Sequence, residues 1–153
     1  MNQNPYLKQY KKQYVEAASR EDLFLMLFNS LLKFITKMRE AVVEKKPADI
    51  QNNCTKAINI LQEFLKTLDP SANPELAENL DKIYHYNITL LLDGNINRDL
   101  NKIDESLNML TGFRDVWKKA IEVYKQKEAS LYSDSDESDE HKFDSYEIKG
   151  EDE

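Results

Sequence analysis

The stretch PADIQNNCTKAINILQEFLKTLDP, residues 47–70, decides the fold class because it holds one helix together with both of its boundaries. Pro47 suits the first helical position, where its missing N–H leaves no hydrogen bond unmade, and Asp69-Pro70 ends the helix. Between these boundaries the apolar residues recur with the period of one helical face. They are Ile50, Cys54, Ala57, Ile58, Leu61, Phe64, Leu65 and Leu68. The segment therefore predicts an amphipathic helix with one buried face.

The sequence on either side of this segment predicts three further helices. The first begins at Ser19–Asp22, a variant of the capping box, and extends to about Lys45. Another begins at Asn73-Pro74 and ends at Asp93-Gly94, and the last begins near Asn97. The alternation of β-branched and polar residues that is typical of strands is absent. Four helices of similar length with short connections predict an all-α protein, an antiparallel up-down four-helix bundle.

Acidic residues are concentrated at the C-terminal end of the 153-residue chain. Residues 132–153 contain ten acidic residues and two lysines, a charge of −8, whereas the whole chain carries −7. The remainder is therefore nearly neutral and lacks the basic face that nucleic-acid binding requires. Because the acidic segment has almost no aliphatic residues to bury, we expect a disordered tail. The predicted organisation is an N-terminal strap or short helix at 1–18, the bundle at 19–131 and the tail at 132–153.

Catalytic and metal-binding groups are scarce in this sequence. Its two histidines are His85 and His141, and it has no Glu-x-x-His motif of the kind that di-iron bundles use. Asp81 and His85 share a helix face, which is at most half of a metal site. Cys54, the only cysteine, lies on an apolar stripe, where a thiol is usually inert, and a glycine-rich phosphate loop is absent. We therefore expect neither an enzyme nor a cofactor, and a metalloenzyme bundle is the remote alternative.

Simple features of the sequence also indicate where the protein resides. A single cysteine excludes an intrachain disulfide, which fits a reducing compartment. Residues 1–14 are polar and aromatic and do not form the apolar region of a signal peptide. The longest apolar run, Leu23–Phe28, is too short to span a bilayer. We predict a cytoplasmic protein without membrane insertion.

The start of the first predicted helix is apolar on every side. Residues Leu23–Phe28, LFLMLF, cover the full circumference over more than one turn, whereas a bundle helix needs one apolar stripe. Such a helix has to be covered by its own chain or by a partner. A strap formed by the N-terminal segment, in which Tyr6, Tyr10 and Tyr14 recur every four residues, is one interpretation. The other is a groove for an amphipathic helix of a partner, and both hold if the strap can be displaced.

Several motifs occur in an order that is typical of one protein family. They are Asn4-Pro5-Tyr6, Tyr10, Leu25–Asn29 (LMLFN), Leu76–Leu80 (LAENL), Ile83–Tyr86 (IYHY), Leu92–Asp99, and the pair Arg114 and Trp117. In order and spacing they resemble the FliS family of flagellin-specific export chaperones over residues 4–125. Arg20, Phe28 and Ser30 depart from the family pattern, which has proline, tyrosine and glycine there. The acidic tail lies beyond the matching region.

The resemblance implies an antiparallel helical bundle that acts as a cytosolic chaperone. It implies that the protein holds the C-terminal helical segment of flagellin, prevents premature polymerisation and delivers the subunit to the type III flagellar export gate. It also implies that no nucleotide or metal takes part. A helical adaptor or regulator that binds another amphipathic partner helix is the alternative.

We predict a partner-binding face built from two helices, with the N-terminal tyrosines beside it. Tyr6 and Tyr10 are expected to cap the empty groove or to help dock at the export gate. The residues expected to contact the partner helix are Leu23, Met26, Leu27, Asn29, Leu80, Tyr84 and Ile88. For Tyr84 and Tyr86, ordinary packing with the hydroxyls at the surface is the simpler interpretation. The acidic tail is expected to be a solubiliser, and an anionic mimic or competitor for a basic site is its alternative.

Overall fold

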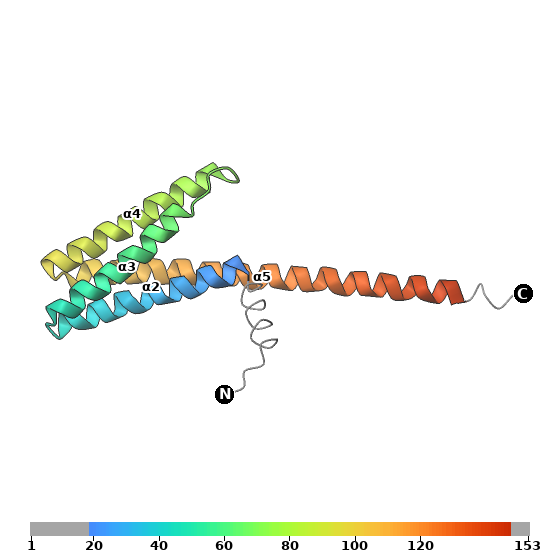
Figure 1. Cartoon of the computed structure of the whole chain (residues 1–153), viewed down its shortest axis with the longest axis horizontal. Coiled ribbons are helices and arrows are strands. Elements are labelled where there is room, and N and C mark those ends of the chain that lie inside the picture. Colours follow the sequence, from blue (N-terminus) through green and yellow to red (C-terminus); the bar gives the residue numbers. More distant parts are fainter. Residues whose placement is uncertain (1–18, 148–153) are drawn as a thin grey trace, which may run out of the picture. The chain divides into compact units, whose positions relative to one another are not determined.

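The computed structural model describes residues 19–147, with side chains as far as Ser133. The predicted strap at 1–18 and residues 148–153 lie outside the described range. The described residues form four α-helices and no strand, which confirms the prediction of an all-α protein (Figure 1). The helices are α2 (Arg20–Val43), α3 (Pro47–Lys66), α4 (Pro74–Asn97) and α5 (Leu100–Glu147).

The described residues divide into two compact units, one that ends at Asp115 and one that begins at Val116. The first unit contains α2, α3, α4 and the first turns of α5, and its successive helices run in opposite directions (Figure 1). Helix α3 packs against both α2 and α4, and α5 adds Ile103 and Leu110 to the shared core. The first unit is therefore the antiparallel up-down four-helix bundle that the sequence predicts.

Short-range features mark the starts of α2, α3 and α4, as predicted: side-chain caps for α2 and α4, and a proline for α3. The side chain of Ser19 accepts a hydrogen bond from the backbone N–H of Asp22 at 3.2 Å. Pro47 occupies the first turn of α3, and Oδ1 of Asn73 accepts from the backbone N–H of Leu76 at 3.1 Å. Ser19 and Asn73 each satisfy an N–H group that a helix start leaves without a partner inside the helix, whereas Pro47 has no N–H group to satisfy.

The boundary between α4 and α5 differs from the prediction. Helix α4 does not end at Gly94 but continues through it to Asn97, and Arg98 forms the turn with a φ of 52°. A Cβ on the buried Gly94 would lie 2.6 Å from Cγ1 of Ile103, so glycine lets α4 and α5 approach closely. Oδ1 of Asp99 then accepts hydrogen bonds from the first N–H groups of α5. The predicted helix end was wrong because this glycine serves packing between helices.

Helix α5 extends further than the predicted end of the bundle at residue 131. Where the composition predicts a disordered tail from residue 132, the structure continues α5 to Glu147. The segment after Trp117 is rich in lysine, glutamate, glutamine and alanine, which favour helix, and contains no proline or glycine before Gly150. Local propensity therefore extends α5 along residues 122–133, whose side chains are exposed and gain nothing from burial.

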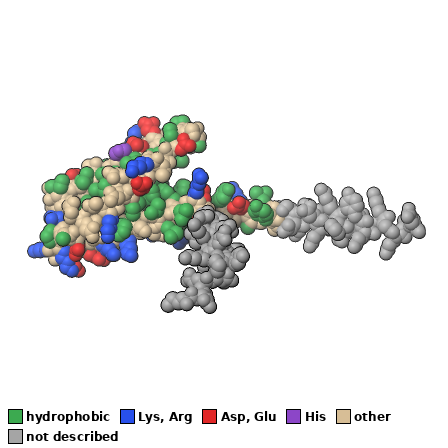
Figure 2. Space-filling view, in the orientation of Figure 1, with side chains coloured by type: hydrophobic (Ala, Val, Ile, Leu, Met, Phe, Trp, Pro, Cys, Tyr) green, Lys and Arg blue, Asp and Glu red, His purple; other side chains and the backbone are tan. Residues whose placement is uncertain are grey.

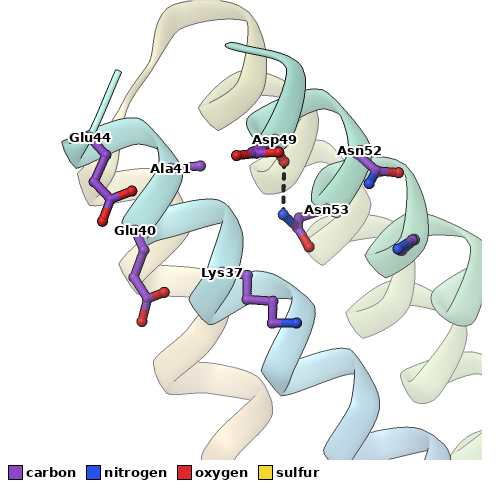
Figure 3. Close-up of a pocket in the computed structure, with 8 residues that line it drawn as sticks. Lys37, Glu40, Ala41, Glu44, Asp49, Asn52 and Asn53 are labelled. Atoms are coloured by element: carbon purple, nitrogen blue, oxygen red, sulfur yellow. Dashed lines mark hydrogen bonds between the residues drawn. The ribbon is translucent and has the colours of Figure 1, made fainter. Parts of the chain in front are cut away.

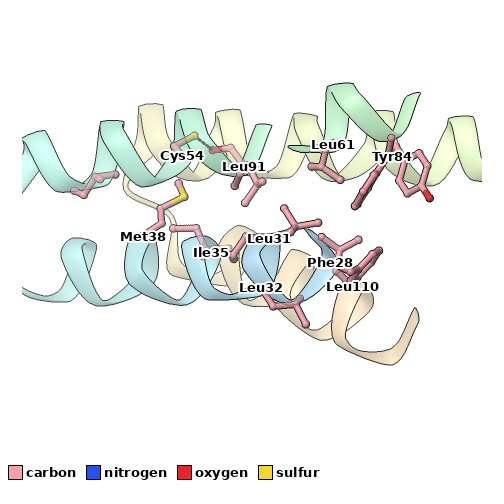
Figure 4. Packing of buried hydrophobic residues seen from close by; sticks show 14 of the residues in the cluster. Phe28, Leu31, Leu32, Ile35, Met38, Cys54, Leu61, Tyr84, Leu91 and Leu110 are labelled. Atoms are coloured by element: carbon pink, nitrogen blue, oxygen red, sulfur yellow. Dashed lines mark hydrogen bonds between the residues drawn. The ribbon is translucent and has the colours of Figure 1, made fainter. Parts of the chain in front are cut away.

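The inward faces of all four helices form the core of the first unit (Figure 4). The apolar stripe predicted for α3 is buried or half-buried throughout. Cys54 lies on this stripe, where its Sγ donates to the backbone oxygen of Leu91 at 3.6 Å and burial raises the pKa of the thiol. Cys54 is therefore a packing residue and not a nucleophile. Other large buried side chains are Phe28, Leu31, Ile35, Met38, Ile50, Leu61, Tyr84, Leu91, Ile103 and Leu110.

Candidate partner-binding site

The first turns of α2 carry apolar side chains that the described part of the chain does not cover. Leu23, Met26 and Leu27 are 42%, 65% and 46% exposed, and we call these three residues the α2 patch. Their spacing of three and four residues makes them neighbours on the helix surface, beside the buried face that Phe28 and Leu31 form. Figure 2 shows hydrophobic side chains gathered at the surface of the bundle. The surplus of apolar residues predicted for this helix is thus present at its surface.

The same turns of α2 contribute to an aromatic cluster in the core. Phe24 packs on Phe64 of α3 with their ring centroids 4.5 Å apart. Phe28 stacks on Phe64 at 5.6 Å and on Phe113 of α5 at 5.4 Å, and Tyr84 of α4 lies 5.6 Å from Phe64. Aromatic pairs of this kind stabilise a core beyond the area they bury. Rings from all four helices therefore hold the start of α2 in place. The helix turns that carry the α2 patch are thus firmly packed against the core.

Asn29 is exposed beside the α2 patch and is already hydrogen-bonded. Nη1 of Arg114 on α5 donates to Oδ1 of Asn29 at 3.2 Å, and Nε of Arg114 donates to Oδ1 of Asp115 at 3.0 Å. Asn29, predicted as a contact residue, therefore also ties α2 to α5. A partner that reaches Asn29 meets a polar group at the edge of an apolar surface.

The structure places the three candidate residues of α4 in or beside the core. Tyr84 is 2% exposed and packs against Phe64, and burial raises the pKa of its phenol to about 12. Leu80 and Ile88 are half-buried and pack against the core cluster. Tyr86, in contrast, is 44% exposed, and its hydroxyl donates to Oε1 of Glu105 at 2.5 Å. The α4 candidates thus lie behind the surface, whereas the α2 patch is open to a partner.

Leu76 and Met109 are among the exposed apolar residues that the sequence did not identify as candidate contacts. Leu76, at the start of α4, is 51% exposed, and Met109 of α5 is 37% exposed. Leu76 lies four residues before Leu80, so the helical period of this stripe was a signal that points to it. Met109 carried no such signal, because its exposure depends on how α5 packs against α4. Tyr6 and Tyr10 lie outside the described residues, and their role stays a prediction.

A polar pocket lies between the end of α2 and the start of α3 (Figure 3). Its volume is about 320 Å³, and Ala41 is the one apolar residue in its lining. Within it, Nδ2 of Asn53 donates to the backbone oxygen of Asp49 at 2.8 Å. Sites for small ligands are lined mainly by apolar and aromatic side chains, so this pocket does not suit one. Its lining consists of Lys37, Glu40, Ala41, Glu44, Asp49, Asn52, Asn53 and Lys56.

Asp81 and His85, considered from the sequence as half of a metal site, lie next to each other as a side-chain pair. Nδ1 of His85 lies 3.3 Å from Oδ2 of Asp81 on the exposed surface of α4. Within the part of the chain that the structure describes, no three His, Cys, Asp or Glu side chains come together to hold a metal ion. In the same part, none of the helices combines the length and the apolar content needed to cross a membrane.

Comparison with known proteins assigns the chain to a family. A family model described as Flagellar protein FliS matches residues 2–124. The chain belongs to the FliS family. This match confirms the resemblance carried by the motifs and includes α2, α3, α4 and the first half of α5. The acidic segment lies beyond the matched residues.

Relatives of known name support the assignment to FliS. The chain is 37% identical over 120 residues to the flagellar secretion chaperone FliS of Bacillus subtilis, an alignment that covers 78% of this chain and 88% of the relative. It is 28% identical over 108 residues to FliS of Escherichia coli, covering 70% and 79% of the two chains. It is 31% identical over 106 residues to FliS of Salmonella typhimurium, covering 69% and 78%. This is a family of secretion chaperones and not of enzymes, as the sequence predicts for this chain.

Proposed function

We propose that this FliS-family protein is a cytosolic chaperone for flagellin. In this proposal it binds the C-terminal helical segment of flagellin, prevents premature polymerisation and assists delivery to the type III flagellar export gate. The relatives named flagellar secretion chaperones support the general role. The observation that carries the proposal is the α2 patch, where three large apolar side chains stay exposed on a packed base.

An amphipathic helix is the occupant that best suits the α2 patch. Leu23, Met26 and Leu27 have the spacing of residues that interlock when two helices pack side by side. A partner helix offers a matching apolar stripe and keeps its polar face in water. Burying one large apolar side chain contributes roughly 1.5–3 kcal/mol, part of which offsets the loss of freedom on association.

The same contact accounts for chaperone activity. A segment of flagellin that becomes a packed helix only in the filament exposes apolar surface before assembly, and exposed apolar surface promotes aggregation. Covering that surface withholds the segment from other subunits until export. Leu80, Tyr84 and Ile88 support the binding face from behind in this proposal, and Asn29 contributes at its polar edge. Tyr6 and Tyr10 cap the empty face or help docking at the gate.

Calorimetric titration with a peptide of the C-terminal segment of flagellin tests the proposal. Leu27→Asp places a charge in the α2 patch and should weaken binding about tenfold or more, because a desolvated carboxylate without a partner is unfavourable. The matched control is Val43→Asp, which introduces the same charge at a 58% exposed position near the other end of α2. It should leave the affinity unchanged. Equal affinities of wild type and a folded Leu27→Asp protein contradict the site.

Tyr84 needs a separate variant because it is buried. Tyr84→Ala opens a cavity and lowers stability whatever the partner does. Tyr84→Phe keeps the ring against Phe64 and removes only the hydroxyl. If Tyr84 supports the face from behind, Tyr84→Phe binds the peptide as wild type does. A loss of affinity in Tyr84→Phe shows instead that the partner reaches the phenol directly.

Mass spectrometry of the proteins that co-purify from cells identifies the partner. Flagellin is expected in wild-type samples and should be depleted in Leu27→Asp samples. Recovery of a different protein through the same residue, without flagellin, contradicts the chaperone assignment and indicates a helical adaptor or regulator.

A further inference from the structure

The exposed face of α2 changes from apolar to basic about two turns after the α2 patch. One stripe of the helix contains residues spaced by four, three and four positions, namely Met26, Ser30, Lys33 and Lys37. Met26 is 65% exposed, and both lysines are exposed as well. Residues 23–39 contain no aspartate or glutamate. An apolar part and a basic part therefore follow each other on one exposed face of α2.

A third lysine joins this basic region from α3. Nζ of Lys56 lies 5.4 Å from the ring centroid of Phe34, which is next to Lys33 in the sequence. Lys37 and Lys56 also line the polar pocket between α2 and α3 (Figure 3). Two adjacent helices therefore contribute to one basic region, and we call Lys33, Lys37 and Lys56 the lysine cluster.

Acidic residues limit the lysine cluster on one side only. Three of the residues that line the polar pocket are acidic, and they lie at the end of α2 and the start of α3, namely Glu40, Glu44 and Asp49. Glu44 already pairs with Lys46 at 2.8 Å. On its other side the lysine cluster is continuous with the α2 patch along the same helix face.

The lysine cluster lacks a counter-charge among the described residues. Its three ammonium groups form no ion pair there, whereas Lys46, Lys66 and Lys82 each pair with a glutamate. Two lysines four residues apart on a helix repel each other, so Lys33 and Lys37 do not strengthen α2. A carboxylate that approaches from outside therefore meets ammonium groups that it does not have to take from another residue.

We propose that the lysine cluster binds carboxylates of the partner helix, so that the chain selects an amphipathic helix with acidic residues about two turns beyond its apolar anchors. This inference rests on the proposed function, since it takes the α2 patch as the place where those anchors bind. At a rise of about 1.5 Å per residue, Lys33 and Lys37 lie about 10 and 16 Å along α2 from Met26, a span of roughly twelve residues of a partner helix. Such charge complementarity selects the partner and its register more than it raises the affinity.

The composition of the face favours a partner helix over the acidic segment of this chain. Residues 132–153 carry a charge of −8 but have almost no aliphatic side chains. That segment offers carboxylates to the lysine cluster and little to the α2 patch. An amphipathic helix with both apolar and acidic residues matches the whole face.

Two synthetic helical peptides test the inference without flagellin. They share one leucine stripe and differ only at the positions two to three turns beyond it, which hold glutamate in one peptide and glutamine in the other. In titration calorimetry at low salt, wild type should bind the glutamate peptide about three- to tenfold more tightly. Raising the salt concentration to about 1 M shortens the screening length to about 3 Å and should remove this preference.

Variants of the two α2 lysines locate the effect. Lys33→Gln/Lys37→Gln should reduce the preference for the glutamate peptide to about twofold or less, because only Lys56 remains. Lys33→Glu/Lys37→Glu should reverse it, so that a third peptide with lysine at the same positions binds more tightly than the glutamate peptide. The matched control is Lys45→Gln/Lys82→Gln, which removes the same charge from exposed positions outside the lysine cluster and should keep the preference. Circular dichroism shows that each variant is folded.

Each outcome supports or overturns the inference. Equal affinities of wild type for the glutamate and glutamine peptides, including no binding of either, overturn it. An equal loss of preference in the control overturns it too, because net charge alone would then explain the effect. A tighter binding of the glutamate peptide after Lys33 and Lys37 are neutralised would show that the acidic segment of this chain takes the lysine cluster, which also contradicts the proposal.

Failure of the proposed function is a separate result. If wild type does not bind the C-terminal peptide of flagellin, the proposed function fails. The preference between the two synthetic peptides still decides whether the lysine cluster selects an acidic helix.

Discussion

Helices α2 and α3 pack against each other, yet they use their apolar residues differently. Every large apolar residue of α3 is buried or half-buried, and its exposed positions are polar or small. Helix α2 also has a buried stripe but leaves Leu23, Met26 and Leu27 exposed at its start. The comparison separates a helix that serves only the core from one that serves both the core and an outer surface. Stability and partner binding should therefore respond to different substitutions in the two helices.

The largest expected effect contrasts one substitution in the two helices. Leu61→Ala in α3 removes a fully buried side chain and should lower the free energy of unfolding by about 2–5 kcal/mol. Leu27→Ala on the exposed side of α2 should change it by no more than about 0.5 kcal/mol. Urea denaturation followed by circular dichroism measures both. Similar losses in the two variants would show that the α2 patch is packed as tightly as the α3 stripe.

Tyr84 of α4 packs on Phe64, on the buried face of α3, so the stability of the protein at high pH is a second test of how well that face is buried. The pKa of Tyr84 is about 12 in the folded protein and 10.0 without burial, so the phenol is neutral in both states below pH 10. Between pH 10 and 12 the unfolded chain ionises first, and stability falls by roughly 2–3 kcal/mol. Denaturation of wild type and Tyr84→Phe across this range should show the decline as a difference between them. If the stabilities of wild type and Tyr84→Phe changed equally with pH, the phenol of Tyr84 would be accessible to solvent.

Affinity for the partner, unlike stability, should depend on exposed residues of α2 and not on those of α3. Leu23→Ala/Met26→Ala shortens two side chains of the α2 patch. It should lower the affinity for the flagellin peptide about 10–100-fold, roughly 1.4–2.8 kcal/mol of binding free energy. Gln62→Ala, at an exposed position of α3, is the control and should leave the affinity as it is. Titration calorimetry compares the three proteins. An equal effect of Gln62→Ala would place the partner across α3 as well.

The smallest expected effect concerns how the two helices begin. Ser19 caps α2 through its side chain, whereas Lys46 precedes α3 without a side-chain cap. Ser19→Ala should lower the free energy of unfolding by about 1 kcal/mol, and Lys46→Ala should leave it nearly unchanged. Thermal denaturation resolves the difference. No loss in Ser19→Ala would indicate that packing alone fixes the start of α2.

Helix α3 shows how much of the fold local rules can predict. Its first residue, its period and its buried face all follow from short-range features, namely Pro47 at the start and apolar residues on one side. The same rules predict the starts of α2 and α4 from Ser19 and Asn73. Each of these features depends on residues within one or two turns of one another, so a single sequence contains them.

Helix α4 shows where those rules stop. Gly94 reads as a helix end in the sequence, but it is a contact point with Ile103, nine residues further along. Tyr84 was a candidate contact residue, but the rings around it place it in the core. Both outcomes depend on which helix lies opposite, and no local pattern specifies that.

The sequence by itself determined the helical class, the helix starts, the scarcity of catalytic groups and the surplus of apolar residues in α2. Those properties come from composition and from spacing within a helix. Tertiary structure alone decided which surplus residues are exposed, that Asn29 is bonded to Arg114, and that Asn87 and Ser106 meet. The physical reason is that exposure and hydrogen bonding between helices depend on side chains far apart in the sequence, which only the packed bundle brings together.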